Sequence, residues 1–573
     1  MARANEVVGA LLQEYADLLS ISGGDPFRVR TYEKAARSVS GHHADISTLD
    51  LKGLKAIPNV GESTGKKIAE YFETGSFEAL EELRAKVPPG VRQMISIPTL
   101  GPKKAMMLFQ DLGIATIEQL ADAIQSGTLK GMKGFGEKTE ENILRGIQIM
   151  QQTGDRAQLG TAMELAEEIV GELMLVEGVA RCEFAGSLRR MAETIGDIDI
   201  LATSDTPGSV MEAFASLPIV ERVIARGDTK SSIATTRGLQ VDLRVVPPGV
   251  WGAALQYFTG SKAHNVRTRE IAVRKVLKLS EYGLFDAKSG DLIVAETEEE
   301  VYERLGLTWI PPTLREDRGE IEAALHGKLP ILIELKDIKG DLHTHTNLTD
   351  GLATLEQMIA KARELKYSYY AITDHAPNLY MQRMTDEKML AQRAKVTRLA
   401  KQLKMVLLHG SELNIDAEGG VDWGPDFLGG FDVCVASVHS EFNQSKDEMT
   451  RRIVRACENP HVNIIGHPTG RKIGKRPPIE FDFDEVFRAA ARTGTALEVN
   501  GYPDRLDLRD EHIMWARRHG VKFAIDTDSH STVHLSFMRY GVGTAQRGWL
   551  SKDDVINAWP LARLRKFLKK GRR

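Results

Sequence analysis

The hydrophobic pattern of the first half of the chain changes near residue 150. Before that point apolar residues recur every three or four positions, as in residues 7–19 and 28–38, which predicts helices with short connections. After it, a helical segment at 157–174 precedes an apolar run at 180–185, and residues 240–246 alternate polar with apolar side chains. This alternation is typical of a half-buried strand. The pattern predicts helical N-terminal domains followed by an α/β domain.

From residue 339 the chain repeats a unit in which a short apolar run ends in a polar residue and an amphipathic segment follows. Helical segments of this kind occupy residues 355–365, 387–403 and 485–492. Strand–helix alternation with reactive residues at the carboxyl ends of the strands is the arrangement of a barrel. The runs predict about seven strands rather than eight, at residues 341–345, 371–375, 407–412, 433–439, 464–467, 496–500 and 523–530.

Composition narrows the class of protein only a little. A chain of 573 residues is too long for one core, and 42% hydrophobic with 27% charged residues is ordinary for a globular protein. No apolar run approaches the ~20 residues of a membrane helix, so no membrane partner is expected. Cys182, Cys434 and Cys457 show no close spacing of the kind that suggests disulfide pairs. They are therefore expected to be free thiols in a reducing cytosol. The net charge of −4 argues against a uniformly basic DNA binder but allows basic segments.

Two aspartates separated by one residue carry the first chemical signal. The apolar residues around Asp197 and Asp199 predict a strand, and strand side chains alternate, so both carboxylates point to one face. Such carboxylates repel each other unless a cation lies between them, and Mg²⁺ shares oxygen ligands of this kind with substrate phosphates. Gly186 and Ser187 would offer a polyphosphate close approach and a hydroxyl, and Arg190 a forked donor. The alternative is a surface strand with two solvated aspartates.

A glycine turn followed by lysines occurs three times within residues 57–138. Each has the form of a helix-hairpin-helix motif, in which backbone N–H groups point at a DNA phosphate. One such match is weak, but three form a repeat that indicates DNA-backbone binding. Three ordinary hairpins with solvated lysines are the alternative. The predicted DNA-binding residues of these turns are Gly61, Lys66, Lys67, Gly101, Lys103, Lys104, Gly134, Gly136 and Lys138.

The segment around the two aspartates resembles the nucleotidyltransferase signature of family X DNA polymerases, the family of DNA polymerase beta. The residues that carry this resemblance are Gly186, Ser187, Arg190, Gly196, Asp197, Ile198 and Asp199. Asp242, on the polar face of residues 240–246, matches the family's third catalytic aspartate. The resemblance implies that the three aspartates bind two Mg²⁺ or Mn²⁺ ions. Gln240 departs from the pattern, because the vertebrate beta enzyme has an arginine at that position.

Residues 257–261 resemble the segment that this family places against the incoming nucleotide. The resemblance implies that Tyr257 and Phe258 pack on the sugar, while Asn265 and Arg269 reach minor-groove acceptors. With the closing segment at 309–316, the resemblance covers residues 1–325. The nucleotide-binding residues it implies are Gly186, Ser187, Arg190, Gly196, Tyr257, Phe258, Gly260, Asn265 and Arg269.

The first hairpin also resembles the small lyase domain of the beta polymerases. The resemblance puts Lys67 at the Schiff-base position and Arg28 and Tyr32 in a pocket for a 5′-phosphate. The hairpin departs from the family pattern at Glu62 and Ser63. We therefore expect the 5′-phosphate contact, whereas lyase activity further requires a lysine with a depressed pKa.

Nine histidines and carboxylates in the C-terminal half resemble, in order and type, the ligand set of the PHP (polymerase and histidinol phosphatase) domain. They are His343, His345, Asp350, His375, Glu412, His439, His467, Asp528 and His530. The resemblance implies a metal-dependent phosphoesterase. Imidazoles mixed with carboxylates suit Mn²⁺, Zn²⁺ or Fe²⁺ better than Mg²⁺, and nine ligands are enough for a cluster of three ions.

The resemblances together imply a bacterial-type family X DNA polymerase with a fused PHP domain. The expected fold is multidomain, with α-helical helix-hairpin-helix N-terminal domains, an α/β nucleotidyltransferase palm with a thumb, and a C-terminal distorted (β/α)7 PHP barrel. The predicted boundaries are 1–85 for an N-terminal DNA-binding domain, 86–150 for a fingers-like domain, 151–247 for the palm, 248–325 for the thumb, 326–338 for a linker and 339–573 for the PHP domain.

The implied function is filling of short gaps in gapped or nicked DNA with dNTPs during base excision repair. The PHP domain is expected to act as a 3′–5′ exonuclease or 3′-end processor, in a cytoplasmic, nucleoid-associated monomer. A template-independent nucleotidyltransferase, a small-molecule phosphatase carried on a polymerase, and a DNA-end scaffold with inactive sites are the alternatives. Every ligand position of both family patterns carries a suitable residue, which argues against the scaffold. Clustered carboxylates without cations cost free energy, and a scaffold would have no need of them.

Overall fold

The computed structural model of the protein describes most of the chain. The described residues are 4–40, 46–57, 59–94, 97, 100, 102–129, 132, 135–136, 140, 143–144, 147, 156–351, 353–379, 384–403, 405–442, 444–473, 476 and 478–570. The chain divides into two compact units: the first is Met1–Arg156 with Ala234–Leu239 and Asp317–Ile321, and the second is Ala157–Ile233, Gln240–Glu316 and Glu322–Arg573. Among the described residues, none of the helices combines the length and apolar character needed to span a bilayer.

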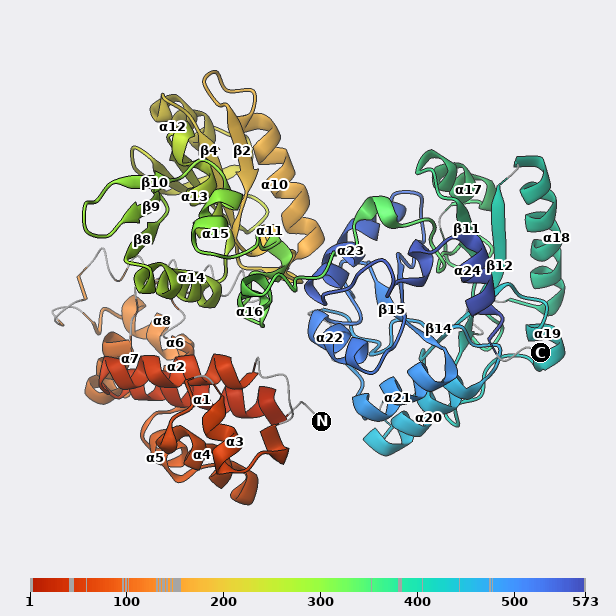
Figure 1. Ribbon diagram of the computed structural model, residues 1–573, viewed down its shortest axis with the longest axis horizontal. Coiled ribbons are helices and arrows are strands. Elements are labelled where there is room, and N and C mark those ends of the chain that lie inside the picture. The colour runs from red at the N-terminus through yellow and green to blue at the C-terminus, as the bar shows by residue number, and fades with distance from the viewer. Residues whose placement is uncertain are drawn as a thin grey trace. The chain divides into compact units, whose positions relative to one another are not determined.

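The first unit consists mainly of helices (Figure 1, red to orange). One hydrophobic core contains Leu12, Ile68 and Leu108, so both predicted N-terminal domains contribute to it. The helices predicted at 7–19 and 28–38 are confirmed as α1 and α2, which pack against each other. The elements are α1 (Ala4–Ile21), α2 (Pro26–Ser40), η1 (Ile46–Thr48), α3 (Leu51–Ala56), α4 (Glu62–Thr74), α5 (Glu78–Lys86), α6 (Pro89–Met94), α7 (Pro102–Leu112) and α8 (Ile117–Gln125).

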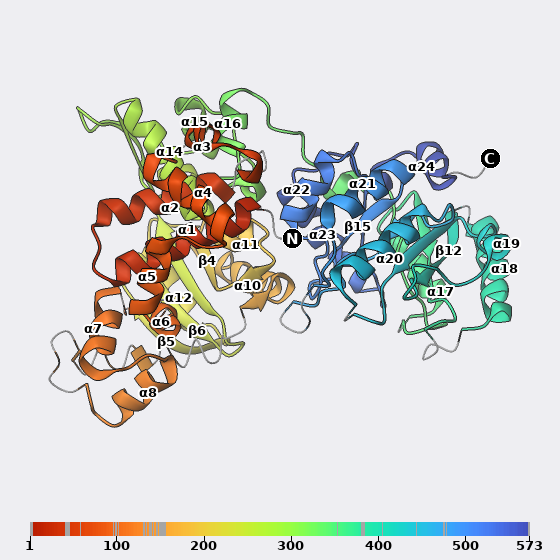
Figure 2. The same cartoon turned by 90° about the horizontal axis from the view of Figure 1, so that it is seen from below.

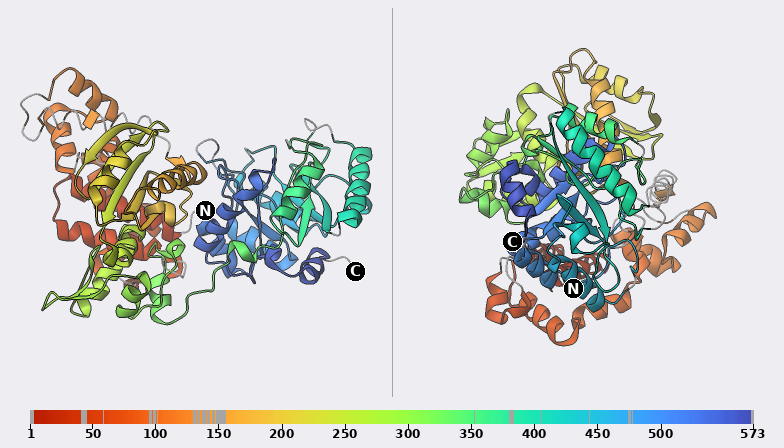
Figure 3. Two further views of the ribbon diagram at one scale, coloured as in Figure 1. Left: turned by 90° about the horizontal axis from the view of Figure 1, so that it is seen from above. Right: turned by 90° about the vertical axis from the view of Figure 1, so that its right-hand side faces the viewer.

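A five-stranded sheet in the order β2-β4-β7-β6-β5 forms the palm (Figure 3, yellow to yellow-green). Strand β4 (Asp197–Thr203) runs antiparallel to β2 (Arg181–Phe184) and parallel to β7 (Gln240–Val246). Its register with β7 pairs Asp199 with Asp242. Paired residues on neighbouring strands point to the same face, so two of the predicted aspartates come together. The other strands of the sheet are β5 (Val220–Arg226) and β6 (Lys230–Thr235).

Helix α13 packs on the palm face that carries the aspartates. Leu201 of β4 shares a hydrophobic cluster with Trp251 and Ala254 of α13, and residues at even spacing along a strand share a face. The thumb region adds a three-stranded antiparallel sheet, β10-β9-β8. The elements around the palm sheet and in the thumb are β1 (Ala157–Gln158), α10 (Leu159–Leu173), α11 (Gly186–Arg189), β3 (Thr194–Ile195), α12 (Pro207–Ala215), η2 (Pro248–Val250), α13 (Trp251–Thr259), α14 (Lys262–Arg274), β8 (Leu277–Ser280), β9 (Gly283–Asp286), β10 (Leu292–Val294), α15 (Glu298–Arg304), η3 (Pro312–Leu314) and α16 (Glu320–Leu325).

The C-terminal part contains a six-stranded, all-parallel sheet whose strands follow chain order from β11 to β16. Six of the seven predicted runs are confirmed as strands. These are β11 (Tyr369–Ile372), β12 (Val406–Asn414), β13 (Val433–Ser437), β14 (Ile464–Ile465), β15 (Ala496–Asn500) and β16 (Phe523–Asp526).

The first predicted run, residues 341–345, is an irregular segment rather than a strand. It still lies between the two edges of the sheet, because Ala371 N donates to Asp341 O and His345 N donates to Ser529 O, at 2.9 and 2.8 Å. Other N–H groups of the segment are bound by side chains; Leu342 N, for example, donates to Asp526 Oδ1 at 2.8 Å. Side-chain acceptors replace part of the backbone ladder, which explains the irregular geometry.

Helices surround this sheet. Helix α18 lies along β12 (Figure 1), and α20 and α21 are neighbours (Figure 2). The helices predicted at 355–365, 387–403 and 485–492 are confirmed as α17, α18 and α21. The elements are η4 (Leu335–Asp337), α17 (Leu355–Glu364), α18 (Asp386–Leu403), α19 (Pro425–Leu428), α20 (Lys446–Glu458), α21 (Phe483–Thr493), α22 (Asp510–Arg518), η6 (His534–Phe537), α23 (Met538–Arg547), η7 (Ile556–Ala558) and α24 (Leu561–Leu568).

A buried ion network joins the palm to the thumb. Glu298 of α15 accepts hydrogen bonds from Arg189 Nη1 and Nη2, at 2.9 and 3.0 Å, and from Arg315, whose side chain is fully buried. Burial opposes ionisation of Glu298, but the two guanidinium groups outweigh it and lower its pKa from 4.5 to about 2. Because the folded pKa is depressed, this stabilisation is complete above pH 4.5 and is lost as the pH falls towards 2.

We predict that Glu298→Ala lowers the free energy of unfolding of this part of the chain by about 3–5 kcal/mol, because the fully buried Arg315 loses its carboxylate partner and Arg189 keeps only Glu183 among its described carboxylate partners. Glu299→Ala, one position further on the exposed face of α15, is the matched control. Urea unfolding of the full chain followed by circular dichroism compares the two. Equal effects would show that the network does not stabilise the fold.

Candidate catalytic and metal-binding sites

The three aspartates predicted from the sequence lie together at the start of β4 and in β7. Asp199 is opposite Asp242 in the parallel register, and Asp197 precedes Asp199 by two residues on the same face. Burial, followed by the charges of Asp197 and Asp242, raises the pKa of Asp199 to about 7. A carboxylate whose pKa is raised by neighbouring carboxylates lies in a site that a cation would stabilise.

Gly186 leaves room for the carboxylate of Asp199. The residue opens α11 with φ of 59°, and a Cβ added there would lie 2.1 Å from Asp199 Oδ2. Both the left-handed conformation and the close approach require glycine. Ser187 follows in the first turn of α11 and is half-buried, as is Gly196 directly before β4. The glycine of the Gly-Ser pair therefore determines where a predicted metal ligand lies.

Asp242 is held by two side chains. Gln240 Nε2 donates to Asp242 Oδ1 at 2.8 Å, and Lys230 Nζ lies 3.3 Å from Asp242 Oδ2. Gln240 stands where the vertebrate beta enzyme has an arginine, so an amide and a lysine supply the donors at this carboxylate. The sequence did not predict Lys230 as a partner of Asp242, because the two residues come together only when β6 pairs with β7 in the sheet.

The aromatic pair lies near the aspartates. Asp199, Asp242, Lys230 and Phe258 line one cavity of ≈ 40 Å³. The Tyr257 and Phe258 ring centroids are 5.1 Å apart in an edge-to-face arrangement. The structure thus brings the predicted sugar-contacting residue Phe258 next to the predicted metal ligands.

Arg190 is bound within the protein. Its Nε lies 2.9 Å from Glu316 Oε1, and its Nη1 donates to Thr259 O at 3.0 Å. A triphosphate would have to share this guanidinium with Glu316. The proximity of Arg190 to Asp199 also opposes the rise in the pKa of that aspartate.

Asn265 and Arg269 occupy α14. Asn265 Nδ2 donates to Tyr257 O and Gly260 O, at 2.6 and 3.2 Å, so it holds the turn between α13 and α14. Arg269 is exposed on the same helix, and its Nε donates to Asn265 O at 3.1 Å. Asn265 therefore positions the aromatic segment, and Arg269 stands next to it.

The residues of the predicted 5′-phosphate pocket lie together in the first unit. Lys67 Nζ is 5.7 Å from the Tyr32 ring centroid and 5.8 Å from that of Tyr15. Its ammonium also donates to Ser63 Oγ at 3.2 Å, which makes this departure from the family pattern a partner of the lysine. Arg28, exposed on α2, is hydrogen-bonded to Tyr15. Two cations thus share one side of the unit with two tyrosines.

The structure describes the predicted DNA-binding residues of the three helix-hairpin-helix motifs to different extents. In the first, Gly61 is the N-cap of α4, and Lys66 pairs with Glu62 at 3.3 Å. In the second, Lys103 is exposed in α7, while Lys104 Nζ lies 5.6 Å from the ring centroid of Phe135 in the third hairpin. Gly136 of the third is exposed, and the predicted residues Gly101, Gly134 and Lys138 lie outside the described residues.

All nine predicted PHP ligands converge at the carboxyl ends of the parallel strands. Within the described part of the chain they form three groups whose ligand atoms lie within 4.8 Å of one another. The groups are His345, Asp350, His375 and His530; His343, His345, Glu412 and Asp528; and His375, Glu412 and His439. His467, the ninth residue, lies 3.0 Å from Glu412 Oε1.

Glu412 is the centre of this cluster. Its Oε1 lies 3.1 Å from His439 Nε2 and 3.0 Å from His467 Nε2, and its Oε2 lies 3.1 Å from His375 Nδ1. Two further imidazoles reach Oε2 at 3.3 and 3.4 Å. Burial opposes ionisation of Glu412, but the histidines outweigh it and hold its pKa well below the usual range.

The pKa values of two imidazoles in the cluster shift in opposite directions. Burial, followed by the charges of His530 and His375, lowers the pKa of His345 to about 4. Burial also opposes protonation of His530, but Asp350 and Asp528 outweigh it and raise the pKa of His530 to about 9. Because a ligating imidazole must be neutral on the bound nitrogen, metal binding here would release a proton from His530.

A second layer of residues orients the ligands. Glu498 Oε1 lies 2.6 Å from His343 Nδ1, and its Oε2 accepts from His467 N at 2.5 Å. Asn414 Oδ1 lies 2.8 Å from His439 Nδ1, and Asn500 Nδ2 donates to Asp528 Oδ2 at 3.2 Å. Such partners fix the ring orientation of metal-ligating histidines. Sequence reasoning missed Glu498, whose only signal was a carboxylate inside an apolar strand.

The residues present fit divalent ions at both sites. Nδ1 of His345 and Nδ1 of His467 are buried and have no hydrogen-bond partner among the described residues. Buried polar atoms are normally bonded, so these nitrogens suit a cation. The imidazole–carboxylate mixture suits Mn²⁺, Zn²⁺ or Fe²⁺, whereas the all-oxygen palm site suits Mg²⁺ or Mn²⁺.

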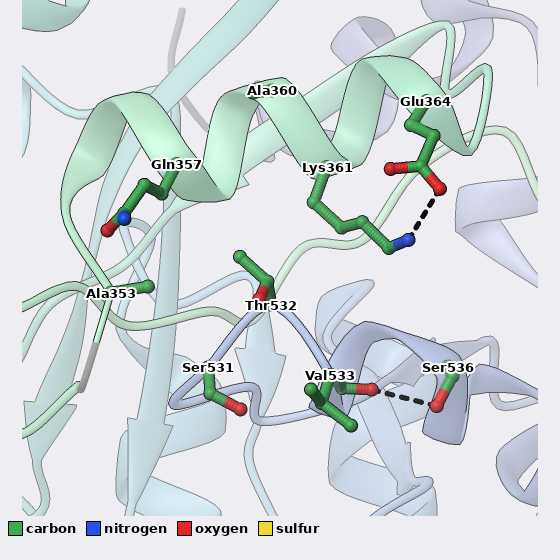
Figure 4. Close-up of a pocket in the computed structure, with 9 residues that line it drawn as sticks. All are labelled: Ala353, Gln357, Ala360, Lys361, Glu364, Ser531, Thr532, Val533 and Ser536. Atoms are coloured by element: carbon green, nitrogen blue, oxygen red, sulfur yellow. Dashed lines mark hydrogen bonds and ion pairs between the residues drawn. The ribbon is translucent and has the colours of Figure 1, made fainter.

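An open depression of ≈ 790 Å³ lies between α17 and residues 531–536 (Figure 4). Residues 531–536 directly follow the predicted ligand His530 in the chain. Lys361 and Glu364 on one wall are paired at 2.6 Å, so their charges offset each other. On the other wall Val533 exposes 68% of its surface. The lining is therefore close to neutral, and phosphate charge would have to be met at the ligand cluster itself.

Comparisons with known proteins match both halves of the chain. Residues 3–77 match a helix-hairpin-helix domain, 91–148 a SAM-like helix-hairpin-helix tandem, 254–316 the DNA polymerase beta thumb and 341–500 the PHP domain. DNA polymerase lambda of Rattus norvegicus is 25% identical over 51% of this chain and 53% of its own length. A probable phosphatase of Thermoanaerobacter sp. (strain X514) is 26% identical over 41% of this chain and 95% of its own length.

A bacterial relative aligns along 98% of the chain. The fold and the two sites define a family X polymerase with helix-hairpin-helix domains, a thumb and a fused PHP domain. The DNA polymerase/3′-5′ exonuclease PolX of Bacillus subtilis (strain 168) is 36% identical over 98% of this chain and 98% of its own length. The chain belongs to the PolX family of DNA polymerases.

We predict that Gly186→Ala lowers the rate of nucleotide incorporation by about a hundredfold or more, because the new methyl group displaces the carboxylate of Asp199. Gly208→Ala, at a palm position where an added Cβ meets nothing within 4 Å, is the matched control. Single-nucleotide extension of a labelled gapped DNA measures both. Normal incorporation by Gly186→Ala would contradict the role of this glycine.

Proposed function

We propose that the protein fills short gaps in DNA during base excision repair and trims 3′ ends through its PHP domain. The observation that carries the polymerase part is the cluster of Asp197, Asp199 and Asp242 with Phe258 lining the same cavity as two of them. The whole-length similarity to PolX supports the combination of both activities in one chain.

In the palm, Asp197, Asp199 and Asp242 would hold two Mg²⁺ or Mn²⁺ ions. When bound, such ions favour ionisation of the primer 3′-hydroxyl and offset the negative charge of the leaving pyrophosphate. Gln240 and Lys230 orient Asp242 for this task, and Ser187 and Arg190 hold the triphosphate. Tyr257 and Phe258 contact the sugar of the incoming dNTP.

In the PHP domain, the nine ligands would hold a cluster of Mn²⁺, Zn²⁺ or Fe²⁺ ions that supplies Lewis acidity for phosphodiester hydrolysis. Glu498 and Asn414 fix the rings of His343 and His439 towards this cluster. His530, whose pKa is raised to about 9, would have to lose its proton in order to act as a ligand.

The first unit would bring gapped or nicked DNA to these sites. Exposed Lys103 and Gly136 in the hairpins contact the backbone, and Arg28 with Tyr32 and Lys67 binds the 5′-phosphate across the gap. We propose that the protein acts at the nucleoid, because gapped chromosomal DNA would be its substrate there, and that it acts as a monomer.

A second candidate function for the PHP domain is hydrolysis of small phosphomonoesters. The alignment with a probable phosphatase over 95% of that protein favours it. Release of phosphate from p-nitrophenyl phosphate, set against release of nucleotides from a DNA 3′ end, distinguishes the two. The nuclease assignment requires the DNA substrate to be turned over faster.

We predict that the two activities separate by mutation. Asp197→Ala, Asp199→Ala and Asp242→Ala should abolish gap filling and leave Mn²⁺-dependent 3′→5′ degradation, because the two ligand sets share no residue. His343→Ala and His439→Ala should do the reverse and bind less metal by elemental analysis.

The control for the histidine variants is His326→Ala, which changes an exposed histidine outside the cluster. One labelled gapped DNA, incubated with and without dNTPs, measures both activities in each variant. Survival of degradation after metal loss would assign the nuclease to another site. Loss of gap filling in His343→Ala would show that the PHP cluster supports the whole fold.

We further predict that Arg28→Ala abolishes most of the preference for a 5′-phosphorylated gap over a 5′-hydroxyl gap, while Arg30→Ala, exposed on the same helix, keeps it. The physical reason is the loss of a charge-assisted hydrogen bond to the phosphate. Fluorescence anisotropy with both DNAs at two salt concentrations measures the preference. Equal binding of both ends by the unmutated protein would reject the pocket.

A further inference from the structure

One carboxylate of the second unit is shared by two arginines from opposite sides. Glu316, the last residue that matches the thumb, has Oε1 2.9 Å from Arg190 Nε in the palm and 2.7 Å from Arg547 Nη1 at the end of α23. All three side chains are largely buried. Burial opposes ionisation of Glu316, but the two guanidinium groups outweigh it and lower its pKa.

Arg547 is itself firmly anchored in the PHP domain. Its helix, α23, packs against β15 and β16 of the PHP sheet. Its Nε donates to Asp510 Oδ2 at 2.8 Å, on α22. Because one end of the guanidinium is fixed to α22, the other end presents Nη1 at a defined place.

Arg547 holds the backbone of Arg190 as well as its ion-pair partner. Arg547 Nη1 donates to Arg190 O at 2.9 Å in addition to Glu316. The next palm residue, Met191, has φ of 55°, and a Cβ on Gly543 of α23 would lie 2.5 Å from Met191 Cε. The helix therefore touches the turn that carries Arg190 and has no room to approach further.

We propose that Arg547 is a positioning residue for the polymerase reaction, through which the PHP domain sets the affinity for the incoming dNTP. This inference rests on the proposed role of Arg190 in holding the triphosphate. With Arg547 present, the charge of Glu316 is divided between two cations, and Arg190 keeps donors for a phosphate. Without Arg547, the buried carboxylate holds Arg190 alone, and the turn loses the bond to Arg190 O. Both changes weaken dNTP binding while the metal-binding aspartates stay in place.

The chain offers a matched control on the same helix. Arg539, eight residues before Arg547 on α23, also pairs with the palm, since its Nη1 lies 2.7 Å from Glu167 Oε1 on α10. It contacts neither Glu316 nor Arg190 in the described structure. Arg539→Met and Arg547→Met therefore each remove one arginine between the same two domains, and only the second alters the surroundings of Arg190.

Steady-state gap filling by the full-length protein tests the proposal. We expect Arg547→Met to raise the KM for dNTP about tenfold with kcat little changed, and Arg539→Met to change KM less than about twofold. Arg547→Met with Glu316→Gln should bring KM back towards normal, because no buried carboxylate then holds Arg190. Mn²⁺-dependent 3′→5′ degradation should be unchanged in all variants. Recovery in the double variant and the KM–kcat split would not follow from general destabilisation.

Arg547→Lys covers the case in which Arg547→Met fails to fold. Lysine keeps the charge but cannot bond Asp510, Glu316 and Arg190 O as a fork does, so KM should rise severalfold, and Glu316→Gln should reverse the rise. Equal KM values for the Arg547 and Arg539 variants would overturn the proposal. Absence of gap filling by the unmutated protein would instead reject the proposed function, and an unchanged KM in Arg190→Ala would reject the triphosphate role of Arg190.

Discussion

Both candidate sites depend on the free-energy cost of holding several ionisable groups together in a buried volume. Desolvation and like charge disfavour such clusters unless cations or counter-charges offset them. In the palm the raised pKa of Asp199 records this cost directly. In the PHP domain the imidazoles around Glu412 offset the cost of burying that carboxylate and lower its pKa. Bound cations would offset the crowding of the remaining ligands.

The two sites reach this crowding by different routes. The palm uses strand register: β4 and β7 run parallel, Asp199 pairs with Asp242, and Gly186 allows the backbone of α11 to approach. The PHP domain uses strand ends, from which single ligands project towards one point, and a second layer led by Glu498 orients them. Register gives a compact all-oxygen site, whereas converging strand ends collect a larger set of mixed ligands.

Sequence reasoning predicted the ligands better than their surroundings. Alternation of polar and apolar residues and the repeated run-plus-ligand units are local signals, so the strands β4 and β7 and six of the PHP strands were predictable. The nine residues that cluster in the structure were predicted from the resemblance to the PHP domain, because Asp350 lies outside every apolar run. Lys230, Glu498 and Arg547 were not, because their roles depend on which strands and helices become neighbours. The segment 341–345 was predicted as a strand, but side-chain acceptors such as Asp526 bind its N–H groups and disrupt the ladder.

The central place of Glu412 has a consequence for how the PHP domain would exchange its metals. This carboxylate belongs to two of the three ligand groups, and it contacts His345 and His375 of the remaining one. An ion entering one group therefore changes the charge and the geometry offered to the other two. Metal binding at any one of the three groups would thus be coupled, through Glu412, to metal binding at the other two.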